Sequence, residues 1–357
     1  VEKNKEEILR RMNILQKAGV RVALFPEMCL TGYTVGDLVN HSLLQKAAME
    51  AMLDIASQTG DMAVIVGLPI VQHGRLFNCA AVLQDGEVRG IVPKTYLPNG
   101  NEFYETRWFV GGEQAENMLE SKDLCCAFGS DLVFDMGDFL FAVEICEDLW
   151  TPIPPSCKLA LEGADIIFNP SASNALACKH AYRRELIKQQ SARLFCGYVY
   201  AGAGFGESTS DLVFCGYTGV YENGRALAEG KRFTMAGDSA IADVDIERLR
   251  YQRQRSGSFH QVRELSAPAS LMEVNGEDAS SLPLRRPLEK FPFIPKDDMA
   301  AEQLEEIVRI QTTGLMTRLN AIGCKKLVIG VSGGLDSTLA LLVCIRAFDL
   351  LGLDRAG

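Results

Sequence analysis

The segment FLFAVEICEDLW, residues 139–150, changes character at its centre. Its first half is a short apolar run, which is the pattern of a buried strand. The run ends at Cys146, and Glu147 and Asp148 follow at once, as suits the first turn of a helix. A thiol between a buried strand and a helix N-terminus lies where the local field favours thiolate. The segment therefore predicts either a reactive cysteine or, since the chain has eleven cysteines, a buried structural one.

Composition excludes several classes of partner. Hydrophobic residues make up 47% and charged residues 23% of the 357-residue chain, which is ordinary for a globular protein of roughly two domains. The net charge of -10 disfavours binding to nucleic acid or to an anionic membrane. No apolar run is long enough to span a bilayer. The cysteines are scattered without the paired spacing of a metal motif, which favours reduced thiols in a cytoplasm.

Strands and helices alternate over most of the chain, with hairpins inserted, so we expect an α/β domain with a layered, mixed sheet. Asp85-Gly86 and Asn223-Gly224 predict tight hairpin turns. From about 264 to 298 the pattern gives way to a linker composition. The expected helices are 4–18, 43–57, 157–163, 179–195, 300–319 and 338–350, and the expected strands are 20–25, 62–69, 131–134, 139–145, 164–169, 196–201, 212–221, 239–245 and 325–331.

Glu27 and Lys94, like Cys146, stand at the ends of apolar strands. Strand C-termini that converge on one sheet edge form active sites. A cysteine nucleophile needs a proton acceptor, which Glu27 can be, and an oxyanion stabiliser, which Lys94 and the backbone N–H of Glu147 can be. Taken singly, Glu27 could instead be a helix cap and Lys94 a surface lysine. None of the four histidines stands in a histidine–acid dipeptide, so a Cys–His enzyme is the poorer interpretation.

Three ordered motifs decide between these alternatives: FPEMCLTGY at 25–33, PKTYLP at 93–98 and EICEDLW at 144–150. They resemble the nitrilase (carbon–nitrogen hydrolase) superfamily, and most closely the glutaminase domains of the glutamine-dependent NAD synthetase family. The resemblance covers about residues 1–265 and recurs at NPSAS and GESTSDLVF. It implies a nitrilase-like α-β-β-α sandwich domain.

The resemblance also implies roles for single residues. Glu27 is expected to be the general base, Lys94 the oxyanion stabiliser, Cys146 the nucleophile and Glu105 a second glutamate that supports the lysine. One departure is Gly100, where the family usually has tyrosine, so one wall of the substrate pocket is missing or supplied by another residue. The residues that match positions lining the glutamine pocket are Tyr33, Phe103, Glu147, Ser173 and Lys179.

A second motif, SGGLDS at 332–337, follows a predicted strand and opens a helix. Free backbone N–H groups and the positive helix end suit a phosphate there. No lysine precedes the final serine, so it is not a Walker A loop, and a plain strand–helix turn is the alternative. The loop resembles the pyrophosphate-binding motif of ATP pyrophosphatases. This resemblance implies that Asp336 helps to hold Mg²⁺ and that ATP is bound by Ser332, Gly333, Gly334, Asp336 and Ser337.

Together the motifs predict three regions: a glutaminase domain at 1–265, a linker at 266–299, and the N-terminal part of a Rossmann-like ATP pyrophosphatase domain at 300–357. The resemblance implies that ammonia from glutamine is used, with ATP and Mg²⁺, to amidate nicotinic acid adenine dinucleotide to NAD in a homo-oligomer. Because no strand precedes the first helix and the chain stops soon after SGGLDS, we expect both ends to be cut. Two rivals stay open: a stand-alone nitrilase-type amidase and a non-catalytic assembly scaffold.

Overall fold

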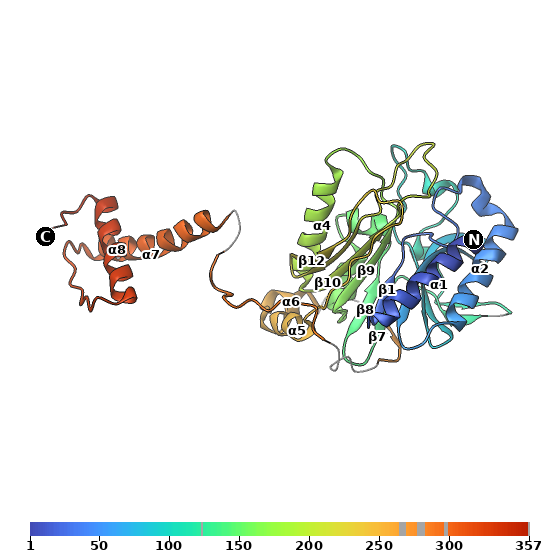
Figure 1. The fold of residues 1–357 in the computed structure, drawn as a ribbon, viewed down its shortest axis with the longest axis horizontal. Coiled ribbons are helices and arrows are strands. Elements are labelled where there is room, and N and C mark those ends of the chain that lie inside the picture. The colour runs from blue at the N-terminus through green and yellow to red at the C-terminus, as the bar shows by residue number, and fades with distance from the viewer. Residues whose placement is uncertain (123, 264–268, 277–282, 296–298, 356–357) are drawn as a thin grey trace. The chain divides into compact units, whose positions relative to one another are not determined.

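The chain forms two separate units in a computed structural model that describes residues 1–122, 124–263, 269–276, 283–295 and 299–355. The first unit runs from Val1 to Arg286 and the second from Pro287 to Gly357. Within the first unit, Figure 1 shows layers of helix, sheet, sheet and helix nearly edge-on. This is the four-layer α-β-β-α arrangement that the sequence predicts.

One sheet of the first unit has four strands in the order β1-β2-β3-β4, and the other has seven in the order β12-β11-β10-β9-β8-β7-β13. A separate pair, β5 (Met118–Glu120) and β6 (Cys125–Ala127), lies between them in the chain. The strands of the two large sheets are β1 (Val22–Leu24), β2 (Ala63–Gln72), β3 (Arg75–Gln84), β4 (Glu87–Pro93), β7 (Leu132–Asp135), β8 (Leu140–Val143), β9 (Ile166–Ser171), β10 (Gly197–Gly202), β11 (Thr218–Glu222), β12 (Arg225–Glu229) and β13 (Ser270–Glu273).

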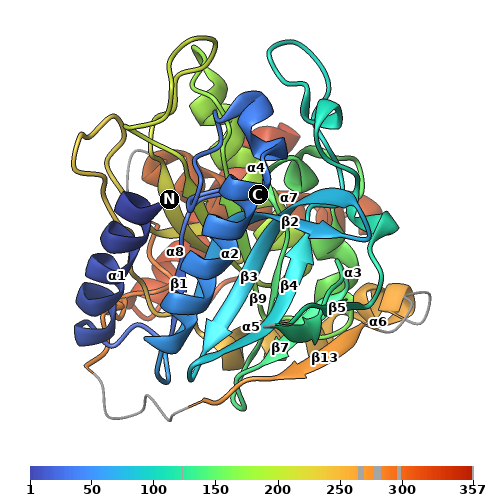
Figure 2. The same ribbon diagram turned by 90° about the vertical axis from the view of Figure 1, so that its right-hand side faces the viewer.

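Each sheet is covered by helices on its outer face. Helices α1 (Glu2–Lys17) and α2 (Ser42–Ser57) lie over the four-stranded sheet, as Figure 2 shows. Helices α3 (Pro155–Leu161) and α4 (Lys179–Leu194) pack on the seven-stranded sheet through a second apolar cluster. Helices α5 (Ile246–Arg255) and α6 (Gly257–Arg263) follow in the chain.

The alternation of side chains along a strand explains why β2 is apolar on both faces. Val64 and Val66 belong to the cluster under the helices, whereas Ala63 and Ile65 belong to the cluster between the two sheets. The latter cluster also contains Phe141 of β8. Because successive residues point to opposite faces, a central strand of this sandwich reads as a continuous apolar run.

Several strands of each sheet run in the same direction, so their C-terminal ends lie at the same edge of the sheet. β1 pairs with β2 in parallel, and two antiparallel steps through β3 make β4 run the same way. In the other sheet β8, β9 and β10 are mutually parallel. The residues that follow β1, β4, β8 and β9 therefore leave their sheets at common edges.

Both predicted hairpin turns are confirmed, but the partner of one strand is not the expected one. Asp85-Gly86 and Asn223-Gly224 have positive φ at both positions, as a two-residue hairpin turn requires. Asn223-Gly224 joins β11 to β12, not to residues 239–245, which form no strand. A two-residue turn can only pair strands that follow it directly, so the expected strand at 239–245 was wrong.

Part of the expected linker at 266–299 belongs to the first unit. β13 pairs in parallel with β7, with Ser270 opposite Leu132, and the guanidinium of Arg286 holds the carboxylate of Glu222, with Nη2–Oε1 at 2.7 Å. β13 is short and at a sheet edge with mostly exposed side chains, so it carries no apolar run that sequence analysis could detect. Residues 266–268, 277–282 and 296–298 of this range lie outside the described part of the chain.

The second unit contains α7 (Ala300–Ile322) and α8 (Leu335–Leu351), which pack together and are joined by an ion pair between Glu305 and Arg346. The expected strand at 325–331 is not formed, and Val328 is fully exposed. The described residues of this unit contain no other strand with which it could pair. Without a partner, its backbone groups gain nothing from the extended conformation over hydration.

One glycine in β2 allows the chain after β1 to lie directly on the sheet. A methyl group on Gly67 would overlap the backbone nitrogen of Met28 and lie 2.9 Å from the carbonyl oxygen of Pro26. The peptide N–H of Leu30 donates to the Gly67 carbonyl at 3.1 Å. Gly67 therefore sets how closely residues 26–30 approach β2.

We expect Gly67→Ala to lower the free energy of unfolding by about 1–3 kcal/mol, because the added methyl group overpacks a rigid backbone contact. Denaturant unfolding measures the change. The matched control is Gly257→Ala, since a methyl group there meets nothing within 4 Å. Equal stability of the two variants would contradict the close approach.

Candidate active site

Glu27, Lys94 and Glu105 form one ion-paired cluster, and each is only 1% exposed. Lys94 Nζ lies 2.7 Å from Glu27 Oε1 and 2.7 Å from Glu105 Oε1. Glu27 follows β1, Lys94 directly follows β4, and Glu105 begins the short helix Glu105–Arg107. A buried ion pair is stable only if its remaining polar atoms are also satisfied, so the surrounding donors matter.

Three further donors reach the two carboxylates, although Oε2 of Glu105 is buried without a partner among the described residues. Asn78 Nδ2 donates to Glu27 Oε1 at 2.7 Å, and the Ala172 N–H donates to Glu27 Oε2 at 2.6 Å. The hydroxyl of Tyr33 donates to Glu105 Oε1 at 2.7 Å. Asn78 and Ala172 are functional-site residues that the sequence analysis missed, because an amide on a strand and a backbone N–H leave no distinctive pattern.

Charge within the cluster sets the protonation of Lys94. Burial alone would lower the pKa of Lys94, but Glu105 and Glu27 together raise it well above its usual value. Burial raises the pKa of Glu105, and the charge of Lys94 opposes that rise. Lys94 is therefore a fixed cation, and its presence is what allows buried carboxylates at this point.

Cys146 begins the five-residue 3₁₀ helix Cys146–Trp150 after β8. It is 6% exposed and has a φ of 45°, a left-handed conformation that is strained for a residue with a side chain. The N–H of Ala172, which donates to Glu27 Oε2 at 2.6 Å, also lowers the pKa of Cys146. The charges of Glu27 and Lys94 act on the same pKa, so the sulfur lies close to the ion-paired cluster.

The resting thiol differs from the expectation of a thiolate. Burial and the negative charge of Glu27 raise the pKa of Cys146, and Lys94 lowers it. The helix that follows is a single 3₁₀ turn, so it adds little dipole field. The geometry therefore suits a thiol that gives its proton to a neighbouring carboxylate as it reacts, not a free thiolate.

The candidate pocket residues lie around this centre. The rings of Tyr33 and Phe103 meet edge-to-face at 6.4 Å, and Tyr33 meets Phe214 likewise at 6.0 Å. Ser173 is buried just after β9. Glu147 is half-buried; burial raises its pKa and Lys94 lowers it. These residues place aromatic and polar side chains near the ion-paired cluster.

Lys179 at the start of α4 is held by contacts that the sequence analysis did not foresee. Its Nζ lies 5.7 Å from the ring centre of Phe103 and 5.3 Å from that of Trp150. It also donates to Asn174 Oδ1 at 2.5 Å, and Asn174 in turn donates to Glu102. Burial lowers the pKa of Lys179. The ammonium is thus oriented, not left free on the surface.

Gly100 lies in an open turn, where the peptide N–H of Phe103 donates to its carbonyl at 3.0 Å. A methyl group on Gly100 would meet nothing within 4 Å. The space that a larger side chain would occupy is therefore not filled by another residue at the Cβ position.

The five candidate residues of the SGGLDS loop lie in the second unit. Gly333 has a φ of 87°, Gly334 precedes α8, and the hydroxyls of Ser332 and Ser337 are 3.2 Å apart. Asp336 lies exposed in the first turn of α8. The loop has the free glycine-rich geometry expected of it, although the strand expected before it is absent.

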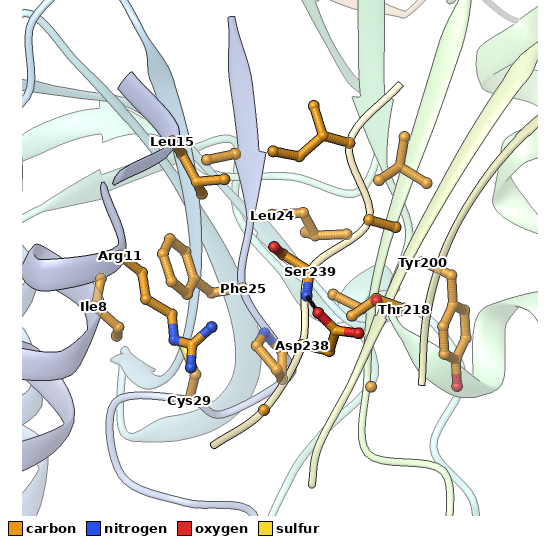
Figure 3. A pocket seen from close by; sticks show the side chains of 18 of the residues that line it. Ile8, Arg11, Leu15, Leu24, Phe25, Cys29, Tyr200, Thr218, Asp238 and Ser239 are labelled. Atoms are coloured by element: carbon orange, nitrogen blue, oxygen red, sulfur yellow. Dashed lines mark hydrogen bonds between the residues drawn. The ribbon is translucent and has the colours of Figure 1, made fainter. Parts of the chain in front are cut away.

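A large cavity of about 1570 Å³ lies beside β1 and is bounded by α1 and residues 234–243. Figure 3 shows Leu24 and Phe25 on one side of it and Ser239 on the other. Its walls include Glu27 but not Lys94 or Cys146. The chemistry of the ion-paired cluster, not the size of this cavity, therefore identifies the candidate active site.

Among the described residues, acidic, cysteine and histidine side chains form no group suited to a metal ion. No described helix is long and apolar enough to cross a membrane.

Comparison with known proteins gives a consistent result. Residues 1–254 match the carbon-nitrogen hydrolase family. The glutamine-dependent NAD(+) synthetase of Mycobacterium leprae is 40% identical over 364 residues, which cover 99% of this chain and 54% of that protein. The chain thus spans about half the length of the curated relatives it matches.

Solved structures agree at the level of the fold. A glutamine-dependent NAD(+) synthetase from Cytophaga hutchinsonii has a TM-score of 0.62 at 29% identity, covering 67% of this chain and 40% of that chain. A glutamine-dependent NAD+ synthetase from Acinetobacter baumannii has a TM-score of 0.58 at 23% identity, covering 97% of this chain and 54% of that chain. The nitrilase-like α/β fold is therefore confirmed for the first unit.

Removal of the central cation should make stability depend on pH. In Lys94→Met, two buried carboxyl groups lose their counter-charge, and breaking such a pair typically costs about 3–5 kcal/mol. Burial already raises the pKa of Glu105 against the opposing charge of Lys94, so without that charge its pKa in the folded variant lies well above that of an unfolded chain, where glutamate has a pKa of about 4.3. The folded variant binds protons more tightly, so its stability should fall as the pH rises above that value.

Denaturant unfolding of Lys94→Met and of the unmodified protein, each at acid and neutral pH, measures this effect. The control is Lys188→Met, which removes a surface ion pair with Glu185 at 2.8 Å and should cost at most about 1 kcal/mol at either pH. A pH-independent loss in Lys94→Met would mean that the two carboxyl groups do not depend on Lys94.

Proposed function

The chain belongs to the carbon-nitrogen hydrolase family, and from this premise we propose that its first unit hydrolyses the side-chain amide of glutamine to glutamate and ammonia. The observation that carries the proposal is the buried Glu27–Lys94–Glu105 cluster with the Cys146 thiol beside it, since the charges of Glu27 and Lys94 both act on the pKa of that thiol. It supplies a nucleophile, a proton acceptor and a fixed cation in one place, as a covalent amide hydrolysis needs.

In this proposal Cys146 Sγ attacks the amide carbon while its proton passes to Glu27. The oxyanion that forms is held by the Lys94 ammonium and the Glu147 N–H. As the carbon–nitrogen bond breaks, Glu27 returns the proton to the leaving nitrogen, and ammonia departs from a thioester. Water then gives a proton to Glu27 and attacks the thioester carbon, which releases glutamate and restores the thiol.

Glu105 acts on Lys94, not on the substrate. Its Oε1 accepts the Lys94 ammonium at 2.7 Å and is itself held by the Tyr33 hydroxyl at 2.7 Å, so Lys94 points at the oxyanion position without needing to reorganise. This accounts for two carboxylates around one lysine.

The pocket offers complementary charges to an amino acid. Lys179 provides a cation for the α-carboxylate and Glu147 an anion for the α-amino group, with Ser173 as a further polar contact. Phe103 and Tyr33 provide apolar surface for the side-chain methylenes. A simple aliphatic amide would use none of these charges, so glutamine is preferred to it.

The wider activity rests on the relatives and on the second unit. We propose that the ammonia serves ATP-dependent amidation of nicotinic acid adenine dinucleotide to NAD, with the loop Ser332–Ser337 holding the ATP phosphates, in a protein whose hydrolase part is residues 1–265 and whose synthetase part begins at residue 300. Asp336 is an exposed carboxylate, and Mg²⁺ at nucleotide sites is usually held by one or two carboxylates together with the phosphates of the substrate. Asp336 would therefore hold Mg²⁺ only together with bound ATP.

Glutamate release from glutamine by the purified protein tests the proposed function. Cys146→Ala should abolish it, because no other group at this position can form the thioester, whereas Cys125→Ala, a change at an exposed cysteine, should leave it unchanged. Turnover by Cys146→Ala at the unmodified rate would contradict the proposal. Hydrolysis of propionamide without hydrolysis of glutamine would favour the stand-alone amidase instead.

Gly100→Tyr should lower the Michaelis constant for glutamine. The ring has room, and it adds apolar contact and excludes water at an open side of the pocket. Steady-state kinetics measures the change, with Gly100→Ala as the control for the backbone effect of replacing glycine. A constant that is unchanged or raised in Gly100→Tyr would mean that the pocket is already closed there.

A further inference from the structure

Asp148 connects the two sheets of the first unit at the candidate active site. Its Oδ2 accepts the Ile145 N–H at 2.8 Å, and its Oδ1 accepts the Tyr96 N–H at 2.8 Å. The Thr95 N–H lies 3.4 Å from Oδ2. Ile145 directly precedes Cys146 just after β8 of the seven-stranded sheet, and Thr95 directly follows Lys94 just after β4 of the four-stranded sheet.

Local helix capping explains only half of these contacts. An acidic residue in the first turn commonly accepts the N–H before a short helix, and the bond from Ile145 is of this kind. Capping does not require the bonds from Tyr96 and Thr95, which come from a different sheet and are more than fifty positions distant in sequence. The carboxylate therefore does more than end a turn.

The environment of Asp148 is costly for a carboxylate. The residue is 1% exposed. Burial and the nearby Glu144 raise the pKa of Asp148 to about 8, while the N–H groups of Ile145 and Tyr96 and the charge of Lys94 lower it. A carboxyl group that only capped a turn would pay no desolvation cost on the surface. The buried position of Asp148 between the sheets therefore needs another explanation.

A comparable bond joins the sheets on the other side of the cluster. The Ala172 N–H, just after β9 of the seven-stranded sheet, fixes Glu27, which follows β1 of the four-stranded sheet. That bond places the proton acceptor relative to the thiol. In the same way, the bonds of Asp148 place Lys94 relative to the thiol.

We infer that Asp148 is a positioning residue that sets the distance between Lys94 and Cys146 by tying Tyr96 to Ile145. It touches neither the substrate nor the reacting atoms. The inference deepens the proposed function and rests on it in one respect: the distance matters for turnover only if Lys94 holds the oxyanion. The distance also matters for the thiol itself, because the charge of Lys94 lowers the pKa of Cys146.

Alkylation of Cys146 by iodoacetamide tests the inference without relying on glutamine hydrolysis. The rate at Cys146 is followed by mass spectrometry at fixed neutral pH, since only the thiolate reacts. Tyr96→Pro removes the N–H that Asp148 accepts and leaves the Ile145 bond in place. Tyr96→Ala is the matched control, because it removes the same partly exposed side chain but keeps the N–H.

Tyr96→Pro and Asp148→Asn should each slow alkylation of Cys146 about tenfold, as expected if its pKa rises by one unit. Each should also lower kcat for glutamine and leave KM unchanged, because the pocket residues are untouched. Tyr96→Ala should react like the unmodified protein. Asp165→Asn controls for lost stability: Asp165 is equally buried and accepts the Leu140 N–H at 3.0 Å, at the other end of β8.

If folded Tyr96→Pro is alkylated at the rate of the unmodified protein, the inference is overturned. It is also overturned if Tyr96→Ala is slowed as much as Tyr96→Pro. Where Asp148→Asn fails to fold, the comparison of the two Tyr96 variants is sufficient. A protein that alkylates normally but releases no glutamate refutes the proposed function and still leaves the alkylation comparison between variants valid, so the two failures are distinguishable.

Discussion

The ammonium of Lys94 between two buried carboxylates is the interaction on which the site depends. Oε2 of Glu105 is buried without a hydrogen-bond partner among the described residues, but the other three carboxylate oxygens accept specific donors, which lowers the cost of burying three charged groups. Those donors come from β3, from the end of β9 and from the loop that carries Tyr33. Satisfying the charges therefore fixes the relative positions of segments that are far apart in the chain. The fold and the chemistry meet in one set of hydrogen bonds.

This dependence explains why the candidate site lies between two sheets. Glu27 and Lys94 come from the four-stranded sheet, and Cys146 comes from the seven-stranded sheet. Neither sheet alone holds a complete set of groups. The apolar cluster between the sheets, which includes Ile65 and Phe141, therefore supports the geometry of the site as well as the stability of the fold.

Local signals in the sequence predicted helices α1 to α4, α7 and α8, most of the buried strands, both hairpin turns and the positions of Glu27, Lys94 and Cys146 at strand ends. These features depend on short-range patterns: apolar runs, tight-turn dipeptides and motifs at strand ends. Helices α5 and α6 were not predicted, and β13 could not be, because its position is decided by the free edge of β7 and not by its own side chains. The irregular residues 325–331 and the sheet-bridging bonds of Asp148 likewise depend on tertiary contacts that no local pattern records. The partner of β11, by contrast, follows from the two-residue turn at Asn223-Gly224.

The N–H of Ala172 has a consequence for how little the site must rearrange. While Glu27 is charged, that N–H stabilises its Oε2, and because it also lowers the pKa of Cys146 it favours negative charge on the sulfur as well. When the thiol proton passes to Glu27, the negative charge leaves the oxygen and develops on the sulfur, within the field of the same fixed peptide dipole. No backbone atom has to move for that dipole to act in both states, so proton transfer asks for little reorganisation of the site.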